Sequence, residues 1–114
     1  MMCQLLDAVA YLHHKGICHR DIKLENLILT PDKQVKLLDF GFSVFYSTEQ
    51  NLKLLCGTPS YMAPELLQKG ISRDTQGYRG PPIDLWTCGI VFYALLTGHL
   101  PFAAHTERDL YKKI

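Results

Sequence analysis

The sequence predicts an α+β fold that is mainly α-helical and contains one small β-hairpin. Apolar residues repeat with helical spacing in residues 1–14, and residues 83–96 form a long apolar stretch that reads as a helix. Between them, short apolar runs at 27–29 and 35–38 flank a polar turn that contains Pro31. A chain of 114 residues forms one domain at most.

The first element is an amphipathic helix at residues 1–14. Its apolar residues recur at three- and four-residue steps: Leu5, Leu6, Val9 and Leu12. Gly16 is placed to end this helix. Because the chain begins inside the helix with no N-cap, we expect it to be part of a longer protein.

The hairpin follows an aperiodic stretch at residues 18–26. In an antiparallel hairpin, the residue that enters the first strand lies beside the residue that leaves the second. Asn26 and Asp39 hold these two positions. We therefore expect two oxygen-bearing side chains to meet at the open end of the hairpin.

The second half of the chain should contain loops and one strong helix. Residues 42–60 are polar and aperiodic, which predicts a long irregular segment, followed by a short helix at 61–68. A glycine-containing irregular stretch at 69–82 should precede the helix at 83–96, which Gly98 ends. The large apolar residues of that helix are interpreted as core: Trp86, Phe92, Tyr93, Leu95 and Leu96.

Composition narrows the possible partners and locations. Twelve Lys and Arg residues against eleven Asp and Glu residues give a net charge of +1 without a basic stripe, so we expect no nucleic-acid partner. Four scattered cysteines indicate a reduced protein of the cytoplasm or nucleus. No signal peptide is visible, and the longest apolar stretch is shorter than the roughly 20 residues that cross a bilayer. Nothing indicates the oligomeric state.

Two short motifs stand on either side of the predicted hairpin. His19-Arg20-Asp21 is followed by Lys23 and Asn26, and the second strand leads into Asp39-Phe40-Gly41. This order resembles the catalytic loop and metal-binding triplet of eukaryotic-type protein kinases. The resemblance continues through Ala63-Pro64-Glu65 and residues 84–89, and so covers residues 1–114.

The phrasing of the motifs resembles the Ser/Thr class, and within it the calcium/calmodulin-dependent and AMP-activated group. The resemblance implies a partial kinase domain: a fragment of the large lobe with its hairpin, catalytic loop and activation segment. It also implies ATP and Mg²⁺ as cofactors and a protein substrate.

Roles follow from the resemblance, residue by residue. Asp21 would be the base that orients the substrate hydroxyl, and Lys23 would lie beside the transferred phosphate, which favours Ser/Thr over Tyr substrates. Asn26 and Asp39 would hold Mg²⁺, which prefers oxygen ligands. Glu25 is grouped with them as a binding residue. Alternatively, it contacts an upstream Arg of a basic substrate, or is a solvated surface residue.

Other motif residues would support the site. Residues 57–61 match the substrate loop of the family, and Thr58 in this loop would bond Asp21 and Lys23. Asp84 would accept hydrogen bonds from the catalytic-loop backbone. Glu65 would normally pair with an Arg beyond Ile114. The residues assigned to structural support are His19, Arg20, Phe40, Gly41, Glu65 and Asp84.

The sequence also departs from the family. It lacks the glycine-rich loop, the small-lobe Lys and Glu, and the last helices, so we expect the isolated chain to be inactive and to expose apolar faces. Leu54 stands where many kinases carry a phosphorylated Thr that pairs with Arg20. Ser47 or Thr48 could supply a phosphate instead.

Three functions therefore remain open. The first is a protein Ser/Thr kinase in the complete gene product. The second is a non-catalytic binding module or decoy that presents a kinase large-lobe surface. The third is a small-molecule phosphotransferase, a class that lacks the Ala-Pro-Glu segment after the substrate loop.

Overall fold

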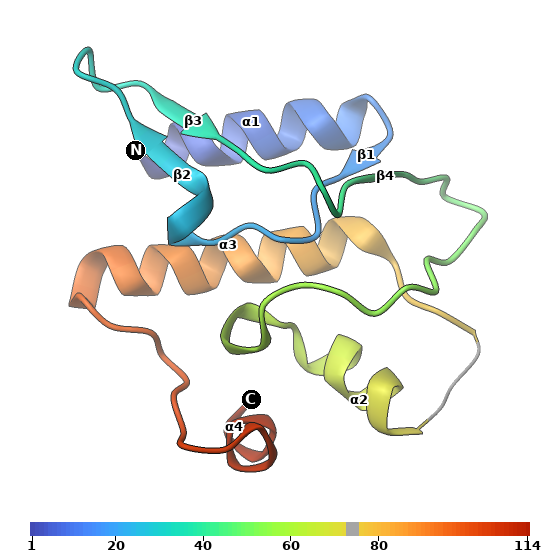
Figure 1. Ribbon diagram of the computed structural model, residues 1–114. Coiled ribbons are helices and arrows are strands. Elements are labelled where there is room, and N and C mark those ends of the chain that lie inside the picture. Colours follow the sequence, from blue (N-terminus) through green and yellow to red (C-terminus); the bar gives the residue numbers. More distant parts are fainter. Residues whose placement is uncertain (73–75) are drawn as a thin grey trace.

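A computed structural model describes residues 1–72 and 76–114, and its central element is a long helix (Figure 1). The helices are α1 (Met2–His14), α2 (Pro64–Ser72), α3 (Gly80–Thr97) and α4 (Glu107–Lys113). In Figure 1, α1 and the strands lie on one side of α3, and α2 and α4 lie on the other.

The helix predicted at residues 1–14 is confirmed. Leu5 and Val9 are buried on its inner face and belong to a core cluster with Ile90 and Val91 of α3. Gly16 lies just past the C-terminus of α1 with φ +72°, a left-handed conformation that favours glycine.

α3 begins three residues earlier than predicted, at Gly80, and carries prolines in its first turn. These positions need no intrahelical N–H donor, so proline is tolerated there. Gly98 ends the helix with φ +81°, as predicted.

The prediction that the large apolar residues of α3 are core is wrong for most of them. Phe92, Tyr93, Leu95 and Leu96 are exposed, whereas Trp86 is partly buried and stacks on Phe102. α3 is apolar on all sides, which is typical of a helix that is buried all round. The described elements of this chain cover only part of its circumference.

The predicted hairpin is confirmed. β2 (Leu27–Leu29) pairs antiparallel with β3 (Val35–Leu37), with Leu27 opposite Leu37. A second pair, β1 (Ile17–Cys18) with β4 (Val44–Phe45), was not predicted. Strands of two residues are too short to show alternation in the sequence.

The helix predicted at 61–68 exists but is shifted. A 3₁₀ turn at Pro59–Tyr61 comes first, and α2 then continues to Ser72, inside the stretch predicted to be irregular. Residues 73–75 of that stretch lie outside the described residues.

Helix α4 was not predicted. Thr106 caps this helix, because its hydroxyl oxygen accepts a hydrogen bond from the Asp109 backbone N–H at 3.2 Å. A Thr followed three residues later by an acidic residue is a helix-start signal that was available in the sequence.

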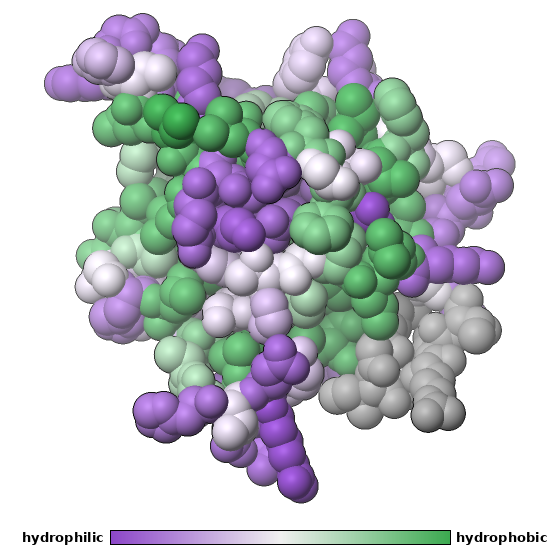
Figure 2. Space-filling view, viewed as in Figure 1, coloured by the Kyte–Doolittle hydropathy of each residue, from purple (hydrophilic) through white to green (hydrophobic). Residues whose placement is uncertain are grey.

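Large apolar side chains remain on the surface, as expected. Phe45 is 79% exposed, Leu96 71% and Leu85 62%. Figure 2 shows hydrophobic surface around a polar centre on the face viewed. Among the helices of the described residues, none has the length and apolarity to cross a membrane.

Candidate active site

Asp84, in the first turns of α3, anchors the loop that carries the candidate catalytic residues. Its carboxylate is fully buried and accepts hydrogen bonds from the backbone N–H groups of His19 and Arg20, at 2.9 and 2.8 Å. His13 Nε2 lies 2.8 Å from the same carboxylate. Arg20 has φ +68°, an unfavourable conformation for a residue with a Cβ, and the bonds to Asp84 hold it there.

His19 connects the loop to the hairpin. Its Nδ1 accepts a hydrogen bond from the Asp21 backbone N–H at 3.3 Å, and its Nε2 lies 2.9 Å from the Leu38 carbonyl. The two contacts are satisfied together when the proton is on Nε2. The His19 ring also meets the Phe40 ring edge-on, at 4.9 Å between centroids. His19 therefore ties Asp21 to the segment that carries Asp39.

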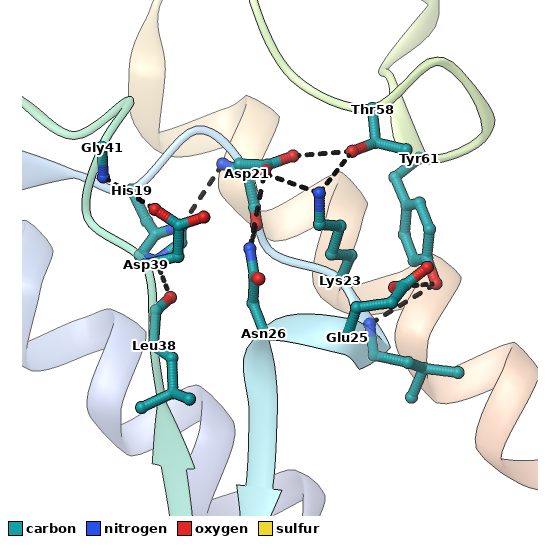
Figure 3. A network of polar contacts seen from close by, with 11 residues as sticks. His19, Asp21, Lys23, Glu25, Asn26, Leu38, Asp39, Gly41, Thr58 and Tyr61 are labelled. Carbon is teal, nitrogen blue, oxygen red and sulfur yellow. Dashed lines mark hydrogen bonds and ion pairs between the residues drawn. The ribbon is translucent and has the colours of Figure 1, made fainter.

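The Asp21 carboxylate is the centre of a polar network (Figure 3). Oδ1 accepts a hydrogen bond from the Thr58 hydroxyl at 2.9 Å, and Oδ2 forms an ion pair with Lys23 Nζ at 2.9 Å. Lys23 Nζ also donates to Thr58 Oγ1 at 2.9 Å. These are the Thr58 contacts that the kinase resemblance implied.

The network lowers the pKa of the Asp21 carboxyl. Burial by itself would raise the pKa of the Asp21 carboxyl. Hydrogen bonds from Lys23, Thr58 and Asn26, together with the charge of Lys23, outweigh burial and hold the pKa below its usual value. The carboxylate is therefore ionised at neutral pH, as an acceptor for a hydroxyl proton must be.

Asn26 and Asp39 lie at the open end of the hairpin, as the strand pairing predicted. The Leu38 backbone N–H donates to the Asn26 carbonyl at 2.8 Å, so Asp39 follows directly beside Asn26. Asn26 Nδ2 donates to the Asp21 carbonyl at 2.8 Å. Figure 3 shows the side chains of Asp21, Asn26 and Asp39 grouped at this end of the hairpin.

These groups fit a magnesium ion by their chemistry. Asp39 is an exposed carboxylate with φ +59°, and its Oδ1 accepts a hydrogen bond from the Gly41 backbone N–H at 3.1 Å. Within residues 1–72 and 76–114, no donor bonds the Asn26 amide oxygen. An amide oxygen and a carboxylate oxygen are therefore available as the hard ligands that Mg²⁺ prefers.

Glu25 does not join this group. Its Oε2 accepts a hydrogen bond from the Tyr61 hydroxyl at 3.3 Å, and the same hydroxyl lies 3.4 Å from the Leu24 backbone N–H. In Figure 3, Glu25 lies on the Tyr61 side of the network, away from Asp39.

Three other residues predicted to support the site are Phe40, Gly41 and Glu65, and each has its own kind of environment. Phe40 is 46% exposed, although one edge meets His19. Gly41 lies so close to Asp39 that a Cβ would come within 3.1 Å of its Oδ1. Glu65 is exposed in the first turn of α2.

Sequence reasoning missed two residues of the site, His13 and Tyr61. His13 meets Asp84 across 71 positions of sequence, and Tyr61 meets Glu25 across 36. No local pattern reports contacts at such separations. His13 lies four residues after the buried Val9, and this helical spacing was a hint for His13 that the sequence offered.

The arrangement offers groups of the kinds that phosphoryl transfer uses. An ionised carboxylate can orient an attacking hydroxyl, a lysine can neutralise a transferring phosphate, and two oxygen ligands can hold a metal.

Comparisons with known proteins agree with this geometry. The protein kinase domain family matches residues 1–114. CBL-interacting serine/threonine-protein kinase 21 of Arabidopsis thaliana is 43% identical over 111 residues, which are 97% of this chain and 25% of that protein. The liver/testis phosphorylase b kinase gamma catalytic chain of Bos taurus is 45% identical over 102 residues, which are 90% of this chain and 25% of that protein.

The serine/threonine-protein kinase kin-29 of Caenorhabditis briggsae is 45% identical over 107 residues, 94% of this chain and 12% of that protein. The chain thus spans a quarter or less of the length of these curated relatives. A family match over the whole chain and relatives of this one class lead to one conclusion: the chain is part of a protein kinase domain and belongs to the eukaryotic serine/threonine protein kinase family.

Proposed function

We propose that the protein containing this chain transfers the γ-phosphate of ATP to Ser or Thr hydroxyls of a protein substrate. The observation that carries the proposal is the Asp21 carboxylate, which is ionised and held by Thr58 and Lys23. A group held this firmly can present one fixed oxygen to a hydroxyl without reorganising during the reaction.

Each residue has a distinct part in this reaction. Asp21 accepts a hydrogen bond from the substrate hydroxyl, orients its oxygen for attack, and takes the proton. As the new O–P bond forms, the bond between the γ-phosphorus and the bridging oxygen breaks, and ADP leaves. Lys23 lies within 2.9 Å of both Asp21 and Thr58, so its charge is available to the phosphate oxygens near the attacking hydroxyl. Thr58 links the substrate loop to Asp21 and fixes the distance between them.

Asn26 and Asp39 are the proposed holders of magnesium. ATP would supply the phosphoryl group, and Mg²⁺ would offset the charge on its phosphates. We propose that parts binding the rest of ATP lie outside these 114 residues, and that the isolated chain is inactive for that reason. Glu25, with its carboxylate exposed beside Tyr61, is the proposed contact for a basic residue of the substrate.

Substitution of Asp21 in the complete protein tests the proposal. Asp21→Asn keeps the shape of the side chain but removes the proton acceptor. We expect phosphate transfer to a Ser peptide to fall roughly a hundred- to ten-thousand-fold. Binding of ATP, measured by fluorescence with a nucleotide analogue, should change less than about threefold, because the reacting oxygen of Asp21 is not needed to hold ATP.

Asp7→Asn is the matched control, since Asp7 is an exposed carboxylate on α1. That variant should transfer phosphate at the wild-type rate. Equal rates for Asp21→Asn and the wild-type protein would rule out Asp21 as the acceptor of the hydroxyl proton. A complete protein that binds ATP but phosphorylates no Ser or Thr peptide would instead support a non-catalytic binding module.

A further inference from the structure

The side chain of Arg20 contacts the segment between the hairpin and α2 as well as Tyr78, which follows α2, and these partners are neutral. Nε donates to the Phe42 carbonyl at 2.7 Å, and Nη1 contacts the Leu54 carbonyl at 3.4 Å and the Tyr78 hydroxyl at 3.2 Å. Within residues 1–72 and 76–114, the guanidinium group therefore bonds only neutral oxygen atoms. An arginine in this setting still supplies directional donors that fix whichever oxygen atoms it contacts.

Tyr78 holds the same segment at three points. Its backbone N–H and carbonyl exchange hydrogen bonds of 2.8 Å with Leu52. Its hydroxyl donates to the Leu54 carbonyl at 2.7 Å while accepting from Arg20. The side chain is 3% exposed, so the hydroxyl has exchanged water for these two partners. Burial raises the pKa of the Tyr78 hydroxyl, which therefore stays neutral and keeps its donor proton.

The held segment leads directly to the catalytic network. Three residues after Leu54, Gly57 packs so closely on the loop that a Cβ would lie 3.0 Å from the Arg20 carbonyl. Thr58 follows and donates to Asp21. A shift of Leu54 would therefore move Thr58 relative to the carboxylate that it positions.

From these contacts we propose that Tyr78 is a positioning residue, whose hydroxyl holds the 52–58 segment against Arg20 and so keeps Thr58 on Asp21 without a phosphate on that segment. The consequence for catalysis rests on the proposed function, whereas the positioning itself does not. Position 54 is a leucine and cannot be phosphorylated. The hydroxyl of Tyr78 supplies a neutral anchor at the carbonyl of that same residue.

The first test is hydrogen exchange on the 114-residue chain. Tyr78→Phe keeps the buried ring and removes only the hydroxyl. We expect amide exchange in residues 52–58 to become about tenfold faster, because the hydroxyl's hydrogen bonds with Leu54 and Arg20 are both lost, while exchange in α1 and α3 stays the same. Tyr11→Phe is the matched control, because Tyr11 lies on α1 and is 62% exposed.

Two outcomes of this test would overturn the proposal. One is unchanged exchange in residues 52–58 of Tyr78→Phe. The other is faster exchange throughout the chain, which would show that the hydroxyl supports the core in general.

The second test uses the complete kinase. Tyr78→Phe should raise KM for a peptide substrate about tenfold and leave KM for ATP within about twofold, because the substrate loop moves and the proposed metal ligands do not. Phosphatase treatment should leave the wild-type rate unchanged. A wild-type enzyme that loses activity with phosphatase, or an unchanged peptide KM, would contradict the proposal. If the wild-type protein transfers no phosphate, the proposed function fails, and hydrogen exchange still decides the role of Tyr78.

Discussion

The 19–26 loop and the 42–56 segment both lack regular secondary structure over most of their length, yet they are held in opposite ways. Most side chains of the 19–26 loop are buried, and its backbone bonds the carboxylate of Asp84 inside the core. No side chain of the 42–56 segment is buried. That segment is attached at separate points, such as the hydrogen bond from the Tyr46 N–H to the Gly16 carbonyl.

The difference shows that irregular backbone is not the same as loosely held backbone. A loop can be fixed as firmly as a helix when buried partners satisfy its polar groups. The 19–26 loop must hold Asp21 in one geometry, and buried polar bonds provide that. The 42–56 segment has fewer anchors, so each of them controls more of its position.

The largest effect is expected for Asp84→Ala. The substitution leaves the buried N–H groups of His19 and Arg20 without their acceptor, and His13 without its partner. We expect a loss of about 3–5 kcal/mol in the free energy of unfolding, measured by urea denaturation of the 114-residue chain. A loss below about 1 kcal/mol would show that Asp84 does not anchor the 19–26 loop.

A second, smaller effect is expected from the apolar side of the same loop. Ile22 has no exposed surface and belongs to the core cluster with Leu5 and Val91. Ile22→Ala should cost about 2–4 kcal/mol in the same measurement. Ile28→Ala is the matched control on β2, where the side chain is 48% exposed, and it should cost less than about 1 kcal/mol. Similar losses for the two variants would show that the side chain of Ile22 is packed no more tightly than that of Ile28.

The same contrast explains how much could be predicted from the sequence. Periodicity and turn chemistry were sufficient to predict α1, α3 and the β2–β3 hairpin, because each of these elements has a pattern within its own residues. The hairpin then brought Asn26 and Asp39 together through pairing geometry alone. The contacts of Thr58 with Asp21 and Lys23 followed from the family resemblance and were confirmed.

The rest depends on contacts that no local pattern records. β1 pairs with β4 across more than twenty residues, and His13 meets Asp84 across 71 positions. The sequence predicts residues such as Leu96 to be core, yet they are exposed, because hydrophobicity alone does not indicate which face of α3 a neighbouring element covers. The capping pair of α4, Thr106 and Asp109, is a local signal from which the helix could have been predicted.

Acid should weaken the 19–26 loop through Asp21. The folded-state pKa of this carboxyl is lowered from its ordinary value of 3.8, so the charged form stabilises the fold above that pH. This stability is lost as the pH falls through the folded-state pKa. Between pH 6 and pH 3, the wild-type chain should lose more stability than Asp21→Asn, which has no such charge. Equal losses for the two proteins would show that the charge of Asp21 does not stabilise the fold. Asp7→Asn is the control and should behave like the wild-type chain.

The smallest effect is expected in the 42–56 segment, at Phe45. This side chain is 79% exposed on β4, where its backbone pairs with Ile17. Phe45→Thr keeps a residue that favours strands and removes a ring that buries little surface in this chain, so unfolding should change by no more than about 0.5 kcal/mol. Urea denaturation of the 114-residue chain measures this directly. A loss above about 1 kcal/mol would mean that the ring is covered in solution, and that the 42–56 segment is held by packing as well as by its separate hydrogen bonds. The 19–26 loop and the 42–56 segment would then differ only in how much of each is buried, and not in the kind of contact that holds them.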